Sequence, residues 1–143
     1  MRSRVAVAAA ILALSACARE TPITAAQLPS IRAGQWSFEG SAGGGVAHGA
    51  VCLKTFADTL GRSHPGCAGF AYSREAGGAV VVRDRCLNPN GSAVQTRIRL
   101  AGDYASRMSF EDDIHIAQPT GPPLHTLVRI SYRYAGCPCP PPA

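Results

Sequence analysis

Short runs of alternating hydrophobic and polar residues, separated by clusters of Gly and Pro, make up most of the chain. The clearest run covers residues 94–100, where Val94, Ile98 and Leu100 alternate with Gln95 and two arginines. A period of two places successive side chains on opposite faces of a β-strand. The pattern therefore predicts antiparallel strands with one buried face and one face in water.

Other runs of the same kind predict further strands. They cover residues 35–40, 46–53, 68–75 and 79–87, the last two joined by a Gly-rich turn at 76–78. Thr55 and Asp58 have the spacing of a capping box, which predicts one short helical turn ending at Gly61. We therefore expect an all-β fold, a single curved antiparallel meander of about seven or eight strands that closes partly into a barrel or half-barrel.

The last two runs predict a hairpin with a definite register. If the turn is centred on Thr120, residues at equal distances from it face each other, and the facing pairs are mostly apolar: Met108 with Tyr132, Phe110 with Ile130, Ile114 with Thr126, and Ile116 with Leu124. Asp112 falls on this apolar face opposite Val128. Its position predicts either a bulge within 111–113 or a polar site at the rim.

The opposite face of the same hairpin is polar, and it pairs Glu111 with Arg129 and His115 with His125. Two facing imidazoles could hold a metal ion and Asp113 could add a carboxylate, but structural zinc sites use four ligands. Exposed histidines on a solvated strand are the simpler interpretation. We therefore expect no metal or other cofactor, and keep His115 and His125 as metal candidates only.

The composition is that of one small globular domain. The chain has 143 residues, 46% of them hydrophobic, and no apolar run approaches the roughly 20 residues of a spanning helix. Aromatic residues make up only 6%, and the single tryptophan, Trp36, is expected beside Phe38 in the core. The net charge of +5 comes from arginines dispersed among acids, so we expect no nucleic-acid partner.

The N-terminal segment has the pattern of an export signal peptide. Residues 1–16 hold two arginines followed by a short apolar run. The signal ends in the run Leu14-Ser15-Ala16-Cys17, which resembles the bacterial lipobox and predicts cleavage before Cys17 and attachment of lipid to it. The alternative is ordinary cleavage after Ala18, which would discard Cys17.

Lipid on Cys17 would anchor the protein to a bilayer, which is the first partner we expect. Because Ala18 rather than Asp follows this Cys, the lipobox resemblance implies the periplasmic face of the outer membrane. Residues 17–31 contain two prolines and are expected to form a polar tether. The β domain is then expected to cover 32–137, and 138–143 to be a Pro-rich tail.

Six cysteines are present: Cys17, Cys52, Cys67, Cys86, Cys137 and Cys139. Export places them in an oxidising compartment, where disulfides form. Without Cys17 five remain, so two bridges leave one thiol, and spacing alone does not select the pairing. We expect Cys52 with Cys67, and Cys86 with one cysteine of the terminal pair. The leftover thiol then lies in Cys137-Pro138-Cys139, where it is either a structural leftover or a redox element.

The arrangement of these elements resembles a known family. The residues that carry the resemblance are Arg32-Ala33-Gly34-Gln35-Trp36, Val51-Cys52-Leu53, Cys67, Cys86 and Gly136-Cys137. Together with the export signal, they are similar to the bacterial cell-envelope proteins grouped as domain of unknown function family 3617. The resemblance implies a small exported antiparallel β domain and pairing among Cys52, Cys67, Cys86 and Cys137, with Cys139 as the free thiol. It implies no activity and no catalytic residues.

The chain has no G-x-S-x-G, H-E-x-x-H, Walker or Rossmann pattern. Catalytic residues can also meet only in space, so this absence lowers the odds of an enzyme without excluding one, and no catalytic residue is assigned. The leading hypothesis is a non-enzymatic, lipid-anchored periplasmic protein that uses its sheet concavity or its exposed strand faces to bind an apolar ligand or another envelope component. The alternative is a thiol–disulfide or metal-binding activity at Cys137-Pro138-Cys139 or at the pair His115 and His125. A void lined by the even-numbered residues of the last hairpin would favour the first hypothesis.

Overall fold

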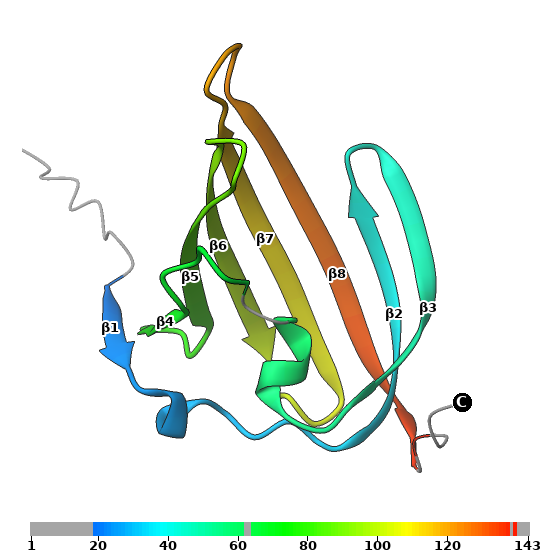
Figure 1. The fold of residues 1–143 in the computed structure, drawn as a ribbon. Helices are drawn as coiled ribbons and strands as arrows, with labels where there is room; N and C mark the ends of the chain where they lie inside the picture. The colour runs from blue at the N-terminus through cyan, green and yellow to red at the C-terminus, as the bar shows by residue number, and fades with distance from the viewer. Residues whose placement is uncertain (1–18, 62–63, 138, 140–143) are drawn as a thin grey trace, which may run out of the picture.

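The computed structural model describes residues 19–61, 64–137 and 139. These residues form one eight-stranded antiparallel sheet that curls strongly without closing, in the order β1-β4-β5-β6-β7-β8-β2-β3 (Figure 1). The strands are β1 (Glu20–Ile23), β2 (Gly34–Ala42), β3 (Gly45–Leu53), β4 (Ala71–Glu75), β5 (Val80–Leu87), β6 (Ala93–Gly102), β7 (Arg107–Ala117) and β8 (Leu124–Gly136). The predicted all-β half-barrel is confirmed. Within the described ranges, no helix is long and apolar enough to cross a bilayer.

The hairpin β7–β8 has the register that the sequence predicts. Met108 faces Tyr132, Glu111 faces Arg129, and the ladder continues through Asp112 without a shift. Asp112 therefore lies on the concave face with no bulge around it. The register follows from the period of two, because a slip by one residue would turn every apolar side chain of the hairpin into water.

The core fills one end of the concave face. Trp36, Val80 and Leu100 are fully buried there. Phe56 of the 3-10 turn η2 (Phe56–Thr59) packs into the same cluster. This turn forms at the predicted place because the carboxylate of Asp58 accepts the backbone N–H groups of Lys54 and Thr55, at 2.7 and 2.8 Å. Figure 1 shows the turn lying inside the curl of the sheet.

The strand order departs from a simple meander. Strands β4 to β8 follow one another in sequence, but β1 pairs with β4 at one edge, and the hairpin β2–β3 adds beside β8 at the other. The chain between β1 and β2 therefore crosses the end of the half-barrel, and Ile31 enters the core on the way. This crossing segment covers one end of the core and connects the two edge regions of the sheet.

The prediction of an irregular tether over 17–31 is wrong for the described part of that range. Residues 20–23 form β1, and η1 (Ala25–Gln27) follows it, a second 3-10 turn that the sequence pattern did not indicate. Pro22 does not prevent the strand, because β1 is an edge strand and an edge tolerates a residue without a backbone N–H. The folded domain thus begins at Glu20. Residues 1–18, with Cys17 and the predicted signal, lie outside the described residues, as do 138 and 140–143 of the tail.

The disulfides differ from the expected pairing. They join Cys67 to Cys86 and Cys52 to Cys139, and Cys137 is the free thiol instead of Cys139. The predicted bond between Cys52 and Cys67 is wrong. Cys52 lies on the edge strand β3, whereas Cys67 forms a β-bridge with Cys86 on β5.

The pairing of Cys52 with Cys139 also follows from the strand order. Gln35 on β2 pairs with Cys52 on one side and with Gly136 on the other. The end of β8 therefore brings the last cysteines beside β3, and Cys139 reaches Cys52. The family resemblance implies bonds among Cys52, Cys67, Cys86 and Cys137. This implication is wrong, because Cys139 and not Cys137 is bonded to Cys52.

Candidate functional site

An apolar groove opens at the end of the concave face opposite the core. It has a volume of about 310 Å³. Its lining residues are Phe38, Gly40, Ser41, Ala42, Gly45, Val46, Ala47, Val128 and Ile130. The void exists because the hairpin β2–β3 places small residues, among them Ala42 and Ala47, at inward positions where Val or Leu would fill the space. Of the even-numbered residues of the last hairpin, two on β8, Val128 and Ile130, line this groove.

Exposure of the inward side chains rises toward this end. On β8, Tyr132 is 8% exposed, Ile130 and Val128 are partly buried, and Leu124 is 49% exposed. Phe56 and Tyr104 cover the core at the other end, but no described residue covers the groove. An apolar surface left open in this way is typical of ligand sites and interfaces.

Asp112 lies in the middle of the concave face. Its neighbours across the two adjacent strands are Ile98 on β6 and Val128 on β8, and Val128 also lines the groove. Its Oδ1 atom is buried and has no hydrogen-bond partner among the described residues. Burial, with the charge of Asp113 as a smaller cause, raises the pKa of the Asp112 carboxyl to about 6. The alternation placed Asp112 on this face, but its lack of a partner depends on the tertiary structure.

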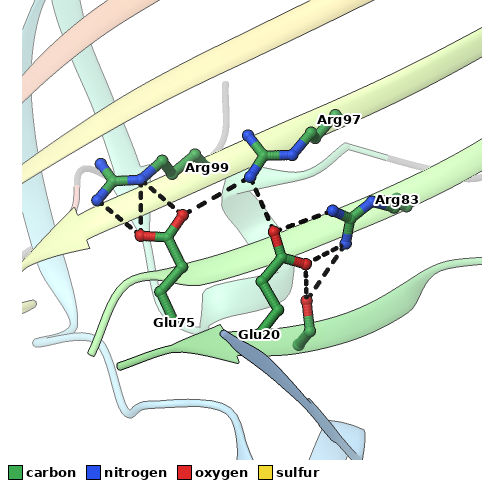
Figure 2. A network of polar contacts seen from close by, with 6 residues as sticks. Glu20, Glu75, Arg83, Arg97 and Arg99 are labelled. Carbon is green, nitrogen blue, oxygen red and sulfur yellow. Dashed lines mark hydrogen bonds and ion pairs between the residues drawn. The ribbon is translucent and has the colours of Figure 1, made fainter. Parts of the chain in front are cut away.

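The convex face carries a network of ion pairs, shown in Figure 2. The carboxylate of Glu20 on β1 contacts Arg83 of β5 at 2.6 Å and Arg97 of β6 at 2.9 Å. Glu75 of β4 accepts three hydrogen bonds from Arg99, two from Nε at 3.0 and 3.1 Å and one from Nη2 at 2.9 Å. Arg97 joins the two halves, because its Nη2 atom lies 3.6 Å from Glu75. These contacts fasten β1 and β4 onto the sheet.

The same network shields part of the convex face from water. Val81 is fully buried although it points to this face, where its strand partners are Ser73 and Arg99. Long arginine stems cover such apolar positions while their charged heads stay in water. The hydrogen bonds from Arg83, with a smaller effect of Arg97, lower the pKa of Glu20 to about 2.

A second polar cluster lies on the convex face of β7 and β8. His115 faces His125 across the strands, and their rings stack with centroids 4.3 Å apart. The Nε2 atoms of His115 and His125 lie 3.1 and 2.5 Å from the same Oδ1 atom of Asp113. The hydrogen bond with His125 is the main cause that lowers the pKa of Asp113. The sequence predicted this neighbourhood, and the structure adds the convergence of the three side chains.

This His–Asp cluster borders a basin of about 480 Å³ on the convex face. Asp113 and His115 form one wall of the basin, and Arg83, Arg85 and Arg97 are among its other lining residues. Three arginines therefore line the basin, whereas no charged residue of the described ranges lines the groove on the concave face.

The free thiol lies beside an aromatic cluster at the end of β8. The Sγ atom of Cys137 is 2.5 Å from the hydroxyl of Tyr134, and the Arg32 guanidinium stacks 4.0 Å from the centroid of that ring. The hydrogen bond with Cys137 is the main cause that raises the pKa of Tyr134. Cys139, two residues further on, is held in the disulfide with Cys52.

No family model, curated protein or solved structure matches this chain. The resemblance to domain of unknown function family 3617 therefore stays a prediction from the motifs.

Proposed function

We propose that the protein is a lipid-anchored, non-enzymatic module of the bacterial envelope whose concave groove binds an acyl chain. The apolar groove of about 310 Å³ at the open end of the half-barrel carries this proposal. Its volume is at the lower end of the range for ligand sites, which suits one narrow chain better than a bulky ring system. The lining is apolar at Phe38, Val128 and Ile130, and the small residues of β2 and β3 keep it open.

The position of Asp112 on the concave face, with one buried oxygen that has no hydrogen-bond partner among the described residues, supports the proposal. A buried carboxyl oxygen without a hydrogen-bond partner costs stability, so the presence of Asp112 here calls for a reason beyond folding. Ligand sites combine an apolar lining with a few polar groups that orient the ligand. Asp112 stands beside Val128 and can meet the polar end of an amphiphile whose chain lies in the groove.

The short distance between Cys17 and the sheet supports the membrane as the source of such chains. Only two residues separate Cys17 from Glu20, where β1 begins. An extended chain spans at most about 3.6 Å per residue, so lipid on Cys17 would hold the sheet edge within roughly 11 Å of the bilayer surface. The two disulfides are compatible with the oxidising compartment that this location implies.

Quenching of Trp36 by brominated 1-dodecanol tests the groove, because an alcohol head group carries no charge to oppose the Asp112 carboxylate. Trp36 is the single tryptophan and lies two residues from Phe38 on the same face of β2, so a bromine atom on a bound chain would quench its emission. We expect saturable quenching in the wild type. Ala47→Phe should weaken binding at least tenfold, or about 1.4 kcal/mol, because it fills the groove.

Ala50→Phe is the matched control. Ala50 is also exposed on β3 but pairs with Ser37 on the convex face, so this substitution should leave the quenching curve unchanged. Equal affinity in the Ala47→Phe variant, or quenching that rises linearly without saturation, would overturn the proposal.

The anchor is tested separately, by intact mass and membrane fractionation of the protein from an expressing bacterium. The wild type is expected in the outer-membrane fraction with the added mass of its lipid, and Cys17→Ser is expected without lipid. Cys137→Ser is the control, since it also removes a cysteine but leaves the lipobox motif intact. An unmodified wild-type chain beginning after Ala18 would contradict the lipid anchor and leave the groove to be judged on its own.

Thiol–disulfide exchange is the second candidate function, favoured by the free thiol of Cys137 near a disulfide that contains Cys139. The thiolate of Cys137 would attack Sγ of Cys139, the bond between Cys137 and Cys139 would form, and Cys52 would leave as a thiolate. Disulfide mapping after incubation at mildly alkaline pH, with free thiols trapped by alkylation, tests this step. Recovery of only the bond between Cys52 and Cys139 would exclude it.

A further inference from the structure

We propose that Asp113, His115 and His125 form a binding site for a divalent transition-metal ion such as Zn²⁺. The three side chains offer two imidazole nitrogens and one carboxylate oxygen, and these atoms all lie within 4.8 Å of one another. Imidazole and carboxylate groups are common ligands of such ions. The site is distinct from the concave groove, because it lies on the opposite face of the sheet.

The fold sets the geometry of the three ligands. His115 and His125 are direct partners across β7 and β8, and Asp113 lies two residues before His115 and so points to the same face. Both Nε2 atoms approach one oxygen of Asp113. The rings stack with an angle of 12° between their planes, so both rings must rotate before their Nε2 lone pairs can meet on one ion.

Admitting the ion requires rotation of the two exposed imidazole rings and small changes in the distances between the ligand atoms. Zinc binds nitrogen and oxygen at about 2.0 to 2.2 Å, so two ligand atoms on one tetrahedral ion lie roughly 3.4 Å apart. The distances of 3.1 and 2.5 Å between nitrogen and oxygen must therefore open by less than about 1 Å. The histidine side chains are 59% and 57% exposed and can rotate without repacking the core.

Three protein ligands leave a coordination position open, as in catalytic zinc sites and unlike closed structural ones. Asp113 and His115 also line the basin that Arg83, Arg85 and Arg97 share. A bound ion would thus add positive charge to a basin already rich in arginine, and a water molecule or a small anion can complete its coordination.

Isothermal titration of untagged protein with ZnCl₂ tests the site. We expect one equivalent of Zn²⁺ to bind, Mg²⁺ to bind at least 100-fold more weakly because it prefers oxygen ligands, and Zn²⁺ to raise the melting temperature because it bridges β7 and β8. The double variant His115→Ala, His125→Ala should lose at least 30-fold in affinity, and Asp113→Asn should lose less.

His48→Ala is the matched control, because His48 is an exposed histidine on the convex face of β3, away from the cluster. It should bind Zn²⁺ like the wild type. The substituted side chains are exposed, so an unchanged circular dichroism spectrum is expected for each variant and should be verified. Equal Zn²⁺ affinity in the wild type and in the folded double variant, or no Zn²⁺ uptake by the wild type, would overturn the proposal.

Discussion

The substitution Glu20→Gln removes the charge that fastens the first strand to the sheet. Glu20 contacts Arg83 and Arg97, while β1 has only β4 as a strand neighbour. The fall in the pKa of Glu20 from 4.5 to about 2 corresponds to roughly 3 kcal/mol. Because the arginine side chains are 46% and 39% exposed, water screens the interaction, and we expect a loss of about 1–2 kcal/mol.

Urea unfolding at pH 7, compared between the wild type and Glu20→Gln, measures this loss. The pKa of Glu20 is lower in the folded protein, so the ionised group stabilises the fold above about pH 4.5 and loses this effect as the pH falls toward about 2. The difference between the two proteins should therefore shrink below about pH 4.5 and nearly vanish near pH 2.

Glu111→Gln is the control for the first substitution, because Glu111 pairs with Arg129 in an exposed ion pair on the same face. It should cost no more than about 0.5 kcal/mol. Equal stability of Glu20→Gln and the wild type at pH 7, or an equal loss in both variants, would refute the conclusion that the network holds β1.

Three further substitutions test separate features. Asp112→Val should stabilise the protein by about 1–3 kcal/mol at pH 7 in urea unfolding, since it removes a buried oxygen without a partner; a loss of stability would show that Asp112 is satisfied. Gly34→Ala should cost more than about 2 kcal/mol in the same assay, because φ is +150° and a Cβ atom would lie 2.6 Å from the carbonyl of Gly136; a fully stable variant would contradict that contact. Replacing Cys67 and Cys86 together by Ala should cost about 2–4 kcal/mol in thermal or urea unfolding, and an unchanged midpoint would mean that this bridge is not formed.

The alternation of apolar and polar residues in the sequence was sufficient to predict the strands of the meander and the register of the last hairpin. It placed Met108 opposite Tyr132 and His115 opposite His125, as the structure has them. Such local patterns are reliable because each residue's face depends only on its own strand and on the turn beside it. Thr55 and Asp58 predicted η2 for the same reason, since a capping box acts within one turn.

The edges of the sheet and the cysteine pairing required the tertiary structure. Prolines near β1 indicated an irregular segment, but residues 20–23 form a strand. Glu20 contacts Arg83 and Arg97 only because β4, β5 and β6 lie side by side. Cys52 bonds Cys139 because β2 is inserted between β3 and β8. No spacing in the sequence shows that β1 pairs with β4 or that β2 lies between β3 and β8.

The sequence by itself determined which side chains share a face: apolar residues in the concavity, charged residues outside, and His115 near Asp113 on one strand. Only the tertiary structure decided that the core fills one end of that concavity and leaves a groove at the other. It also decided that Asp112 has no partner there and that both histidines converge on one oxygen of Asp113. Faces follow from the geometry of a single strand, whereas voids and convergent side chains depend on how the whole sheet curls.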